Sequence, residues 1–194
     1  MNTLITTIHK GDTINDAIRK FSPDKLMFIF PEPAEKTKLE AISRIKKDFK
    51  NLEFENITTK TYDIPQIVKD VDKAIKKELK KGNTVKIHIS ESRKPQAFAA
   101  YFAGLLNKGK LAGVYYLEEE NGSVLTMPML SFKLSKTKTF ILNELNKGNK
   151  DIPSIVTKSK KQKSIIYQHV KDLKADGYLT DDLELTDAGK IVGL

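Results

Sequence analysis

"TVKIHISESRKPQAFAAYFAGLL", residues 84–106, joins a strand, a polar corner and a helix. Apolar, mostly β-branched residues alternate with polar ones in its first seven positions, which is typical of a strand. Ser90 to Lys94 are all polar, and Pro95 follows at a position that the first turn of a helix tolerates. Alanine and aromatic residues then continue to Leu106. The stretch predicts one strand-to-helix unit of an α/β fold.

The same alternation fills the chain before this stretch. Further strands are expected at residues 3–9, 25–30 and 52–59, with amphipathic helices between them. Strands that alternate with helices pair in parallel through right-handed crossovers. Two apolar runs, 113–119 and 123–130, flank Asn121-Gly122, which is a strong hairpin signal. We therefore predict an α/β fold, a Rossmann-like three-layer sandwich with an antiparallel β-hairpin at one edge of the sheet.

The chain after residue 130 lacks this alternation. Helices are expected at residues 137–148, 151–157 and 163–179, and a short two-stranded hairpin at residues 178–186. Three helices and a hairpin in this order are typical of a winged helix-turn-helix. The sequence thus predicts two domains, a Rossmann-like domain of residues 1–130 and a C-terminal winged helix-turn-helix of residues 131–194. The linker between them is expected at about residues 130–136.

Positive charge is concentrated in one segment. The chain has a net charge of +9, and residues 131–174 contribute +8 through eleven lysines and three acidic residues. Such a basic segment is the electrostatic footprint of a protein that binds nucleic acid. A solvated, lysine-rich surface is the alternative that charge alone leaves open. The predicted helix order favours double-stranded DNA as the partner.

The longest helix of the C-terminal half has a predicted DNA-facing side. Ile166, Val170 and Leu173 are spaced i, i+4, i+7 and form its buried face, so the residues opposite them are exposed. Glutamine can read adenine, lysine can reach guanine or phosphate, and serine and tyrosine can bind phosphate. The candidate DNA-binding residues are Lys161, Gln162, Lys163, Ser164, Tyr167, Gln168 and Lys171. An ordinary polar helix face in an interaction domain is the alternative.

Two polar loops are expected to meet at the carboxyl edge of the sheet, where ligands of open α/β folds bind. One follows the first strand at residues 7–12, and the other is the corner at residues 90–94. The helix that begins after the corner favours an anion at its N-terminus, and the hydroxyls, Arg93 and Lys94 complete a site for a phosphorylated ligand. The candidate ligand-binding residues are Thr7, His9, Lys10, Gly11, Ser90, Glu91, Ser92, Arg93 and Lys94. A simple polar helix cap is the alternative interpretation.

Composition and motifs argue against several classes of protein. The absence of cysteine removes disulfides, thiolate nucleophiles and zinc fingers. Gly11 stands alone, without a G-x-G-x-x-G or Walker motif, so no cofactor is predicted. No two histidines have metal-ligand spacing and no carboxylate cluster suggests Mg²⁺, so no catalytic or metal-binding residue is assigned. No stretch is apolar enough to cross a bilayer and no signal-peptide pattern is present, so we expect a cytoplasmic protein.

Two segments of the C-terminal half, residues 162–179 and 185–190, resemble the recognition helix and wing of archaeal and bacterial winged-helix regulators. Their sequences are QKSIIYQHVKDLKADGYL and LTDAGK, in which His169 and Val170 match the His–Leu-like pair of that pattern. The resemblance implies a DNA-binding helix followed by a wing. Three acidic residues depart from the usual wing and predict that it does not grip DNA strongly: Asp181, Asp182 and Glu184.

The layout of the whole chain resembles the CARF (CRISPR-associated Rossmann fold) regulators of archaea and their CARF-like relatives. In that family, the loops after strands one and four of two subunits form a symmetric pocket for cyclic oligoadenylate. The corner keeps Ser90 and Arg93 of the family pattern, and has Glu91 and Ser92 where the family has a glycine pair. The resemblance implies a homodimeric, CRISPR-associated, DNA-binding transcription regulator that senses a phosphorylated ligand, with cyclic oligoadenylate as the candidate.

Two other functions remain open at this point. The Rossmann-like half can serve for dimerisation alone, which would make the chain a ligand-independent dimeric winged-helix regulator. Some CARF proteins cleave cyclic oligoadenylate, so a ring nuclease with an appended winged helix is the enzymatic alternative. His9, Ser90 and Lys94 would then be the groups that contribute to the reaction. We expect a regulator and not an enzyme.

Overall fold

A computed structural model describes residues 1–118, 120–129 and 134–193 of the 194-residue chain. The chain forms two compact units, Met1–Ser131 and Phe132–Leu194. The predicted linker falls partly on residues 130–133, which lie outside the described residues. Within the described part of the chain, no helix is both long enough and apolar enough to cross a membrane.

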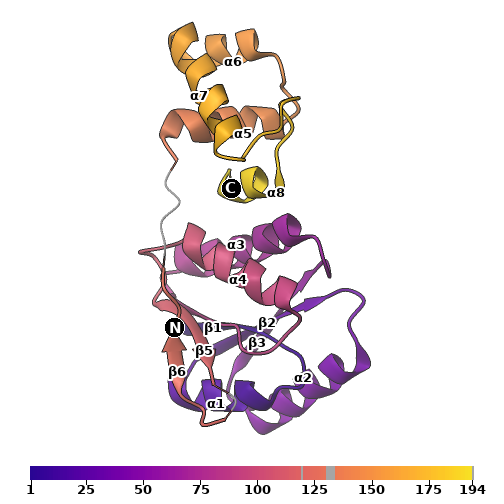
Figure 1. The fold of residues 1–194 in the computed structure, drawn as a ribbon. Coiled ribbons are helices and arrows are strands. Elements are labelled where there is room, and N and C mark those ends of the chain that lie inside the picture. The colour runs from indigo at the N-terminus through magenta and orange to yellow at the C-terminus, as the bar shows by residue number, and fades with distance from the viewer. Residues whose placement is uncertain (119, 130–133, 194) are drawn as a thin grey trace. The chain divides into compact units, whose positions relative to one another are not determined.

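A six-stranded sheet forms the centre of the N-terminal unit, in the order β3-β2-β1-β4-β5-β6 (Figure 1). The strands are β1 (Asn2–Thr7), β2 (Lys25–Pro31), β3 (Glu53–Thr59), β4 (Thr84–His88), β5 (Gly113–Leu117) and β6 (Val124–Thr126). The first five pair in parallel, and β6 runs antiparallel to β5. The Rossmann-like sheet and its edge hairpin, predicted from the sequence, are confirmed.

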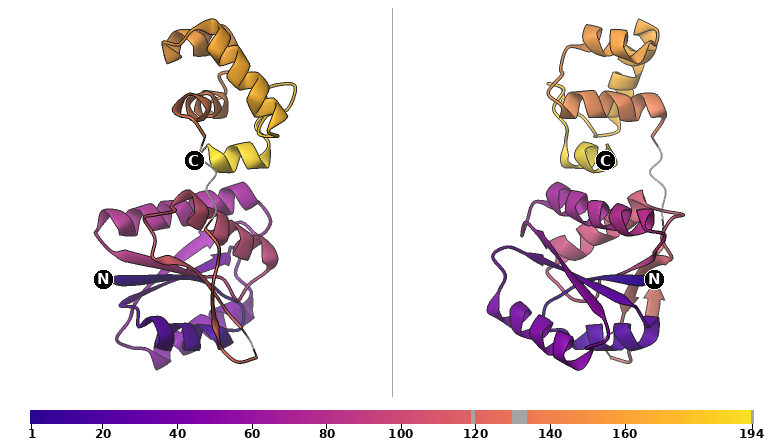
Figure 2. Two further views of the ribbon diagram at one scale, coloured as in Figure 1. Left: turned by 60° about the vertical axis from the view of Figure 1, so that its left-hand side comes forward. Right: turned by 180° about the vertical axis from the view of Figure 1, so that it is seen from behind.

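Helices cover both faces of this sheet (Figures 1 and 2). One face carries α1 (Asp12–Phe21) and α2 (Lys36–Asp48), and the other carries α3 (Ile64–Lys80) and α4 (Lys94–Leu106). Successive residues of a strand point to opposite faces, so a strand covered on both sides is buried throughout. Every residue of β2 is buried for this reason.

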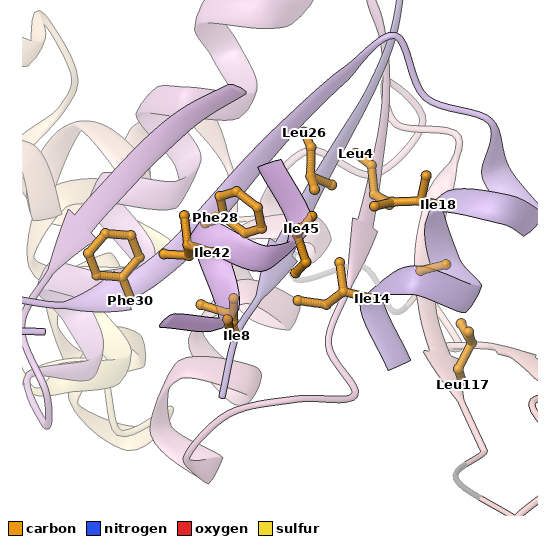
Figure 3. Close-up of a cluster of buried hydrophobic side chains, with 12 residues drawn as sticks. Leu4, Ile8, Ile14, Ile18, Leu26, Phe28, Phe30, Ile42, Ile45 and Leu117 are labelled. Carbon is orange, nitrogen blue, oxygen red and sulfur yellow. The ribbon is translucent and has the colours of Figure 1, made fainter. Parts of the chain in front are cut away.

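Aliphatic and aromatic side chains fill the core between the sheet and the first two helices (Figure 3). Leu4, Leu26 and Phe28 come from β1 and β2, and Ile14 and Ile45 come from α1 and α2. All five are fully buried, and burial of one such side chain stabilises the fold by about 1.5–3 kcal/mol. This packing fixes α1 against the sheet and thereby places the loop that precedes it.

The described part of the C-terminal unit contains four helices. They are α5 (Lys136–Asn146), α6 (Ile152–Ser159), α7 (Lys163–Ala175) and α8 (Asp187–Val192). Their apolar faces meet in one cluster that includes Ile141, Ile155 and Ile166. Only residues 160–162 separate α6 from α7, because Lys160 has a left-handed backbone, with a φ of 54°, that ends α6. The two helices therefore form a tight helix–turn–helix pair.

The hairpin predicted at residues 178–186 is reduced to a single β-bridge between Leu179 and Leu185. The residues between them form a tight turn, in which the Thr180 N–H donates to the Glu184 carbonyl at 2.9 Å and Leu183 has a φ of 62°. Because residues 180–184 form this turn, they are not available to pair as two longer strands. The prediction of a two-stranded hairpin is therefore wrong in its extent.

Candidate ligand cavity and nucleic-acid surface

A cavity of about 550 Å³ lies at the carboxyl ends of β1, β4 and β5. Five of the predicted ligand-binding residues line it: His9, Lys10, Ser90, Glu91 and Ser92. The strand order reverses between β1 and β4, and ligands of open α/β sheets bind at such a point. The structure therefore brings the two predicted loops together.

Other parts of the chain also line this cavity. They contribute Asp12, Thr13, Asp16, Leu117, Glu118 and Gly122. Asp12 lies in the predicted loop, and Asp16 follows it at the i, i+4 spacing that places two side chains on one helix face. That spacing is a signal by which the sequence indicates Asp16. Leu117 ends β5, and Glu118 and Gly122 lie in the β5–β6 connection. No local pattern in the sequence indicates that β5 pairs with β4.

Glu91 binds a set of backbone donors around the start of α1. Its Oε2 accepts hydrogen bonds from the N–H groups of His9 at 3.3 Å, Lys10 at 2.9 Å and Gly11 at 2.5 Å. Its Oε1 accepts from the Thr13 N–H at 2.6 Å and from the Thr13 hydroxyl at 3.1 Å. Glu91 is only 9% exposed. A carboxylate of the chain itself therefore lies where the N-terminus of a helix favours an anion.

Gly11 shapes this loop through its backbone. Its φ is +87°, in the left-handed region that glycine adopts without strain. A Cβ at this position would lie 3.1 Å from the Ile45 Cδ1 atom and 3.4 Å from the Ala41 Cβ atom. Any other residue would therefore disturb both the loop and the packing of α2. We assign Gly11 the role of aligning the donors that Glu91 binds.

Two further side chains of the corner are bound to the protein itself. The Ser90 Oγ accepts a hydrogen bond from the Leu117 N–H at 2.6 Å. Arg93 donates to the Glu35 carboxylate at 2.6 Å and to the Tyr62 hydroxyl at 2.5 Å, and its pKa is raised, chiefly by Glu35. Arg93 thus contacts the loops after β2 and β3 and does not line the cavity.

The remaining two predicted ligand-binding residues also lie outside the cavity lining. Thr7 is fully buried in β1, and within the described residues its hydroxyl has no hydrogen-bond partner. Lys94 is the exposed first residue of α4. The neighbouring His88 is fully buried, with its Nδ1 2.8 Å from the Thr6 Oγ1, and burial lowers its pKa to about 4. His88 is therefore a neutral core residue at pH 7.

Acidic groups predominate in the cavity. Four carboxylates line it, those of Asp12, Asp16, Glu91 and Glu118. Lys10 is the one lysine among the described lining residues, while Arg44 lies 3.7 Å from Asp12 and Arg19 lies 3.5 Å from Asp16. Among the residues that the structure describes, no group of three or more histidines or carboxylates could hold a metal ion. The cavity therefore presents hydrogen-bond acceptors in excess of donors.

The seven predicted DNA-binding residues all lie on the surface of the C-terminal unit. Lys161 and Gln162 are in the turn before α7, and the other five follow in α7. The buried face of α7 is the predicted one, since Ile166, Val170 and Leu173 are at most 9% exposed. The exposed side is polar and basic, and it also carries the large side chains of Ile165 and Tyr167.

Some contacts order the exposed side of α7. The Lys163 Nζ lies 5.5 Å from the centre of the Tyr167 ring, close enough for a cation–π interaction. The Gln168 amide donates to the Asp172 carboxylate at 2.8 Å. Both contacts lie along one helix and leave the side chains at the surface, where a nucleic acid can reach them.

Glu144 joins the helices that lie behind α7. It is 5% exposed and accepts hydrogen bonds from Lys158 at 2.7 Å, Asn149 at 3.1 Å and Lys147 at 3.2 Å. These contacts, that of Lys158 above all, lower the pKa of Glu144 to about 2. Because Lys158 lies in the last turn of α6, the carboxylate links the end of α5 to the end of α6 and so supports the turn into α7.

The fold and the cavity define a class of protein, a Rossmann-like α/β unit with a cavity at the carboxyl edge of its sheet. A family model described as "HFX_2341_N:-like, N-terminal" matches residues 4–122, which is more than half of the chain. The chain therefore belongs to this family. No curated protein matches the sequence.

Solved structures share the fold at low sequence identity. Csm6 of Enterococcus italicus, bound to cyclic hexa-2'-fluoro-hexa-dAMP, is 11% identical over 93% of this chain and 55% of its own, with a TM-score of 0.53. Protein VC1899 from Vibrio cholerae is 10% identical over 76% of this chain and 44% of its own, with a TM-score of 0.54. A type III CRISPR defence DNA nuclease activated by cyclic oligoadenylate is 12% identical over 90% and 34%, with a TM-score of 0.51.

These likenesses concern the fold. The chain spans about half or less of the length of the three proteins. They support the CARF-type Rossmann fold that the sequence resemblance implies.

Proposed function

We propose that this chain is a homodimeric DNA-binding transcription regulator, with a winged helix-turn-helix in residues 131–194 and a ligand-sensing and dimerisation domain in residues 1–130. The exposed basic side of α7, presented by the short turn after α6, is the observation that carries the proposal. In a helix-turn-helix the second helix enters the major groove, and its first turns reach the base edges. The +8 charge of residues 131–174 supplies attraction to phosphates.

Different residues of this surface have different roles in the proposal. Lys161, Lys163 and Lys171 neutralise phosphates, while Gln168 reads a base edge after it leaves Asp172. The acidic turn at residues 181–184 contributes little, because Lys150 pairs with Glu184 and the other carboxylates stay exposed to repel phosphate. Two copies are required, because paired modules read half-sites about one DNA turn apart.

The N-terminal cavity is the proposed sensor, and its candidate ligand is cyclic oligoadenylate. Support comes from its position at the carboxyl edge of the sheet, from its volume, and from the fold shared with a Csm6 that binds a cyclic hexanucleotide. Ligand binding is proposed to change the spacing of the two DNA-binding units, which is a population shift between two dimer states.

Salt-dependent DNA binding by the full chain tests the DNA-binding proposal. Replacing Lys163 and Lys171 together by Ala should reduce the slope of log K against log salt by about two units, because each removes one phosphate contact. The matched control replaces Lys108 and Lys110, two exposed lysines of the N-terminal unit, and should leave the slope unchanged. Equal slopes for all three proteins would show that α7 does not enter the groove.

Calorimetry with cyclic tetra-adenylate and cyclic hexa-adenylate tests the sensor. Binding of either, with a change in DNA affinity of the same preparation, is the expected result. Binding of neither, with DNA binding and dimerisation intact in light scattering, would instead identify a ligand-independent dimeric regulator. Analysis of the nucleotide after incubation tests the ring-nuclease alternative, which requires linear products.

A further inference from the structure

The loop between β1 and α1 presents a ready anion-binding nest, formed by the backbone N–H groups of His9, Lys10, Gly11 and Thr13. Four N–H groups that point at one place bind an anion in many proteins, especially beside a helix N-terminus. Here all four donate to Glu91, at 2.5–3.3 Å, and the Thr13 hydroxyl donates as well. The nest is therefore filled by a side chain of its own chain.

We propose that Glu91 excludes phosphate from this nest and thereby determines which part of a ligand the cavity recognises. The carboxylate is tethered next to its donors, so its effective concentration exceeds that of any free anion. A phosphate that entered would displace Glu91, which is 9% exposed, and leave its charge without partners in a poorly solvated place. Both effects favour the carboxylate over the phosphate.

A second carboxylate, that of Glu35, binds Arg93, which is the other group at this corner that favours phosphate. Arg93 is bound by Glu35 at 2.6 Å and by Tyr62 at 2.5 Å, on the side of the corner that faces the loops after β2 and β3. Glu35 is also held by Lys38 at 3.0 Å, so the pair belongs to a larger network. The chain thus satisfies both its anion nest and its corner arginine internally.

Besides His9, Lys10 and Thr13, the polar groups that remain in the cavity are acceptors, which select a ligand by its hydrogen-bond donors. The carboxylates of Asp12, Asp16 and Glu118 and the hydroxyl of Ser92 line it, and all of them can accept a hydrogen bond. Hydroxyl and amino groups, such as those of ribose and adenine, fit these acceptors, and the phosphates of a nucleotide are directed away from the nest. The nucleotide identity rests on the proposed function, whereas the occupation of the nest by Glu91 does not.

Anion rescue of a Glu91→Ala variant tests the proposal. The full chain is melted in inorganic phosphate or formate, with chloride adjusted to constant ionic strength. The variant should melt below the parent, and anion at about ten times its Kd should raise its Tm by about 3–6 °C, because an anion that binds the emptied nest stabilises the folded state. The parent and the matched control Asp16→Ala, which removes a carboxylate from the same cavity without opening the nest, should show no such rise.

A second variant covers the case in which Glu91→Ala does not fold. Glu91→Gln keeps the side-chain volume but sets an amide NH₂ against N–H donors, so it should melt below Asp16→Asn and gain nothing from formate. Two results would overturn the proposal. The first is that phosphate raises the Tm of the parent as much as that of Glu91→Ala. The second is that Glu91→Gln and Asp16→Asn have the same Tm. Neither melting experiment uses an oligonucleotide or DNA. Its result therefore does not depend on whether the proposed function is correct.

Discussion

The corner at residues 90–94 and the exposed side of α7 are two polar segments that differ in where their partners lie. In the corner, Ser90, Glu91 and Arg93 each bind another loop or strand end of the same unit. On α7, within the described residues, Gln168 alone among the seven predicted DNA-binding residues has a side-chain hydrogen bond. The side chains of the corner therefore connect loops of the N-terminal unit, while the exposed side of α7 remains available for a partner.

Topology explains this difference. The corner follows β4 in the middle of the sheet, so the loops after β1, β2 and β3 and the end of β5 all lie within reach of its side chains. The exposed side of α7 lies opposite the residues that α7 contributes to the hydrophobic cluster of its unit. Polar residues at a central strand end thus find partners in other loops of the unit, whereas the bond of Gln168 on the outer helix side stays within α7.

The largest test of this comparison uses two adjacent isoleucines of α7. Ile166 is fully buried and Ile165 is 39% exposed. Ile166→Ala should lower the free energy of unfolding of the C-terminal unit by about 2–5 kcal/mol, because it leaves a cavity. Ile165→Ala should change it by about 0.5 kcal/mol or less. Native-state hydrogen exchange of the α7 amides measures both, and equal losses would mean that the outer side is packed and not free.

The sequence predicts the fold well because its signals are local and periodic. The apolar runs of β1, β2 and β4 and the Asn121-Gly122 turn lead directly to the Rossmann-like sheet and its edge hairpin. The short ladder at Leu179 and Leu185 is not predictable in this way, because the turn between them consumes the residues that would extend it. Local patterns give an element its type but do not give it its length.

The candidate site is less predictable because side-chain partners come from distant positions. Glu91 lies 78 to 82 residues from the four N–H groups that it binds, and Arg93 lies 58 residues from Glu35. A sequence shows that the corner is polar and near the strand edge. It does not show that Arg93 binds Glu35 and Tyr62 and stays out of the cavity lining, since that depends on the loops after β2 and β3.

A smaller effect separates two serines that undergo the same substitution. Ser90→Ala removes the acceptor of the Leu117 N–H and leaves that donor unpaired, which should cost about 1–3 kcal/mol of unfolding free energy in the N-terminal unit. Ser164→Ala on the exposed side of α7 should change the stability of its unit by about 0.5 kcal/mol or less. Hydrogen exchange of β5 and α7 amides reports on the two units in turn. A Ser90→Ala protein as stable as the parent would show that the corner does not depend on this bond.

The smallest effect appears only in acid and concerns the support behind α7. The pKa of Glu144 is lowered from its ordinary value of 4.5 to about 2, so the folded protein holds this carboxylate ionised where the unfolded chain protonates it. Its contribution to stability is therefore complete above about pH 4.5 and disappears as the pH falls toward 2.

The Tm of Glu144→Gln should lie below that of the parent at pH 6, and the difference in Tm should close between pH 4.5 and 2. Asp182→Asn, an exposed carboxylate of the same unit, is the control and should follow the parent at every pH. Other carboxylates, including Glu78 with a pKa of about 2, titrate in both proteins and cancel from the difference. If the difference in Tm between Glu144→Gln and the parent does not change with pH, Glu144 acts by its shape. In that case its charge does not hold the exposed side of α7 in place.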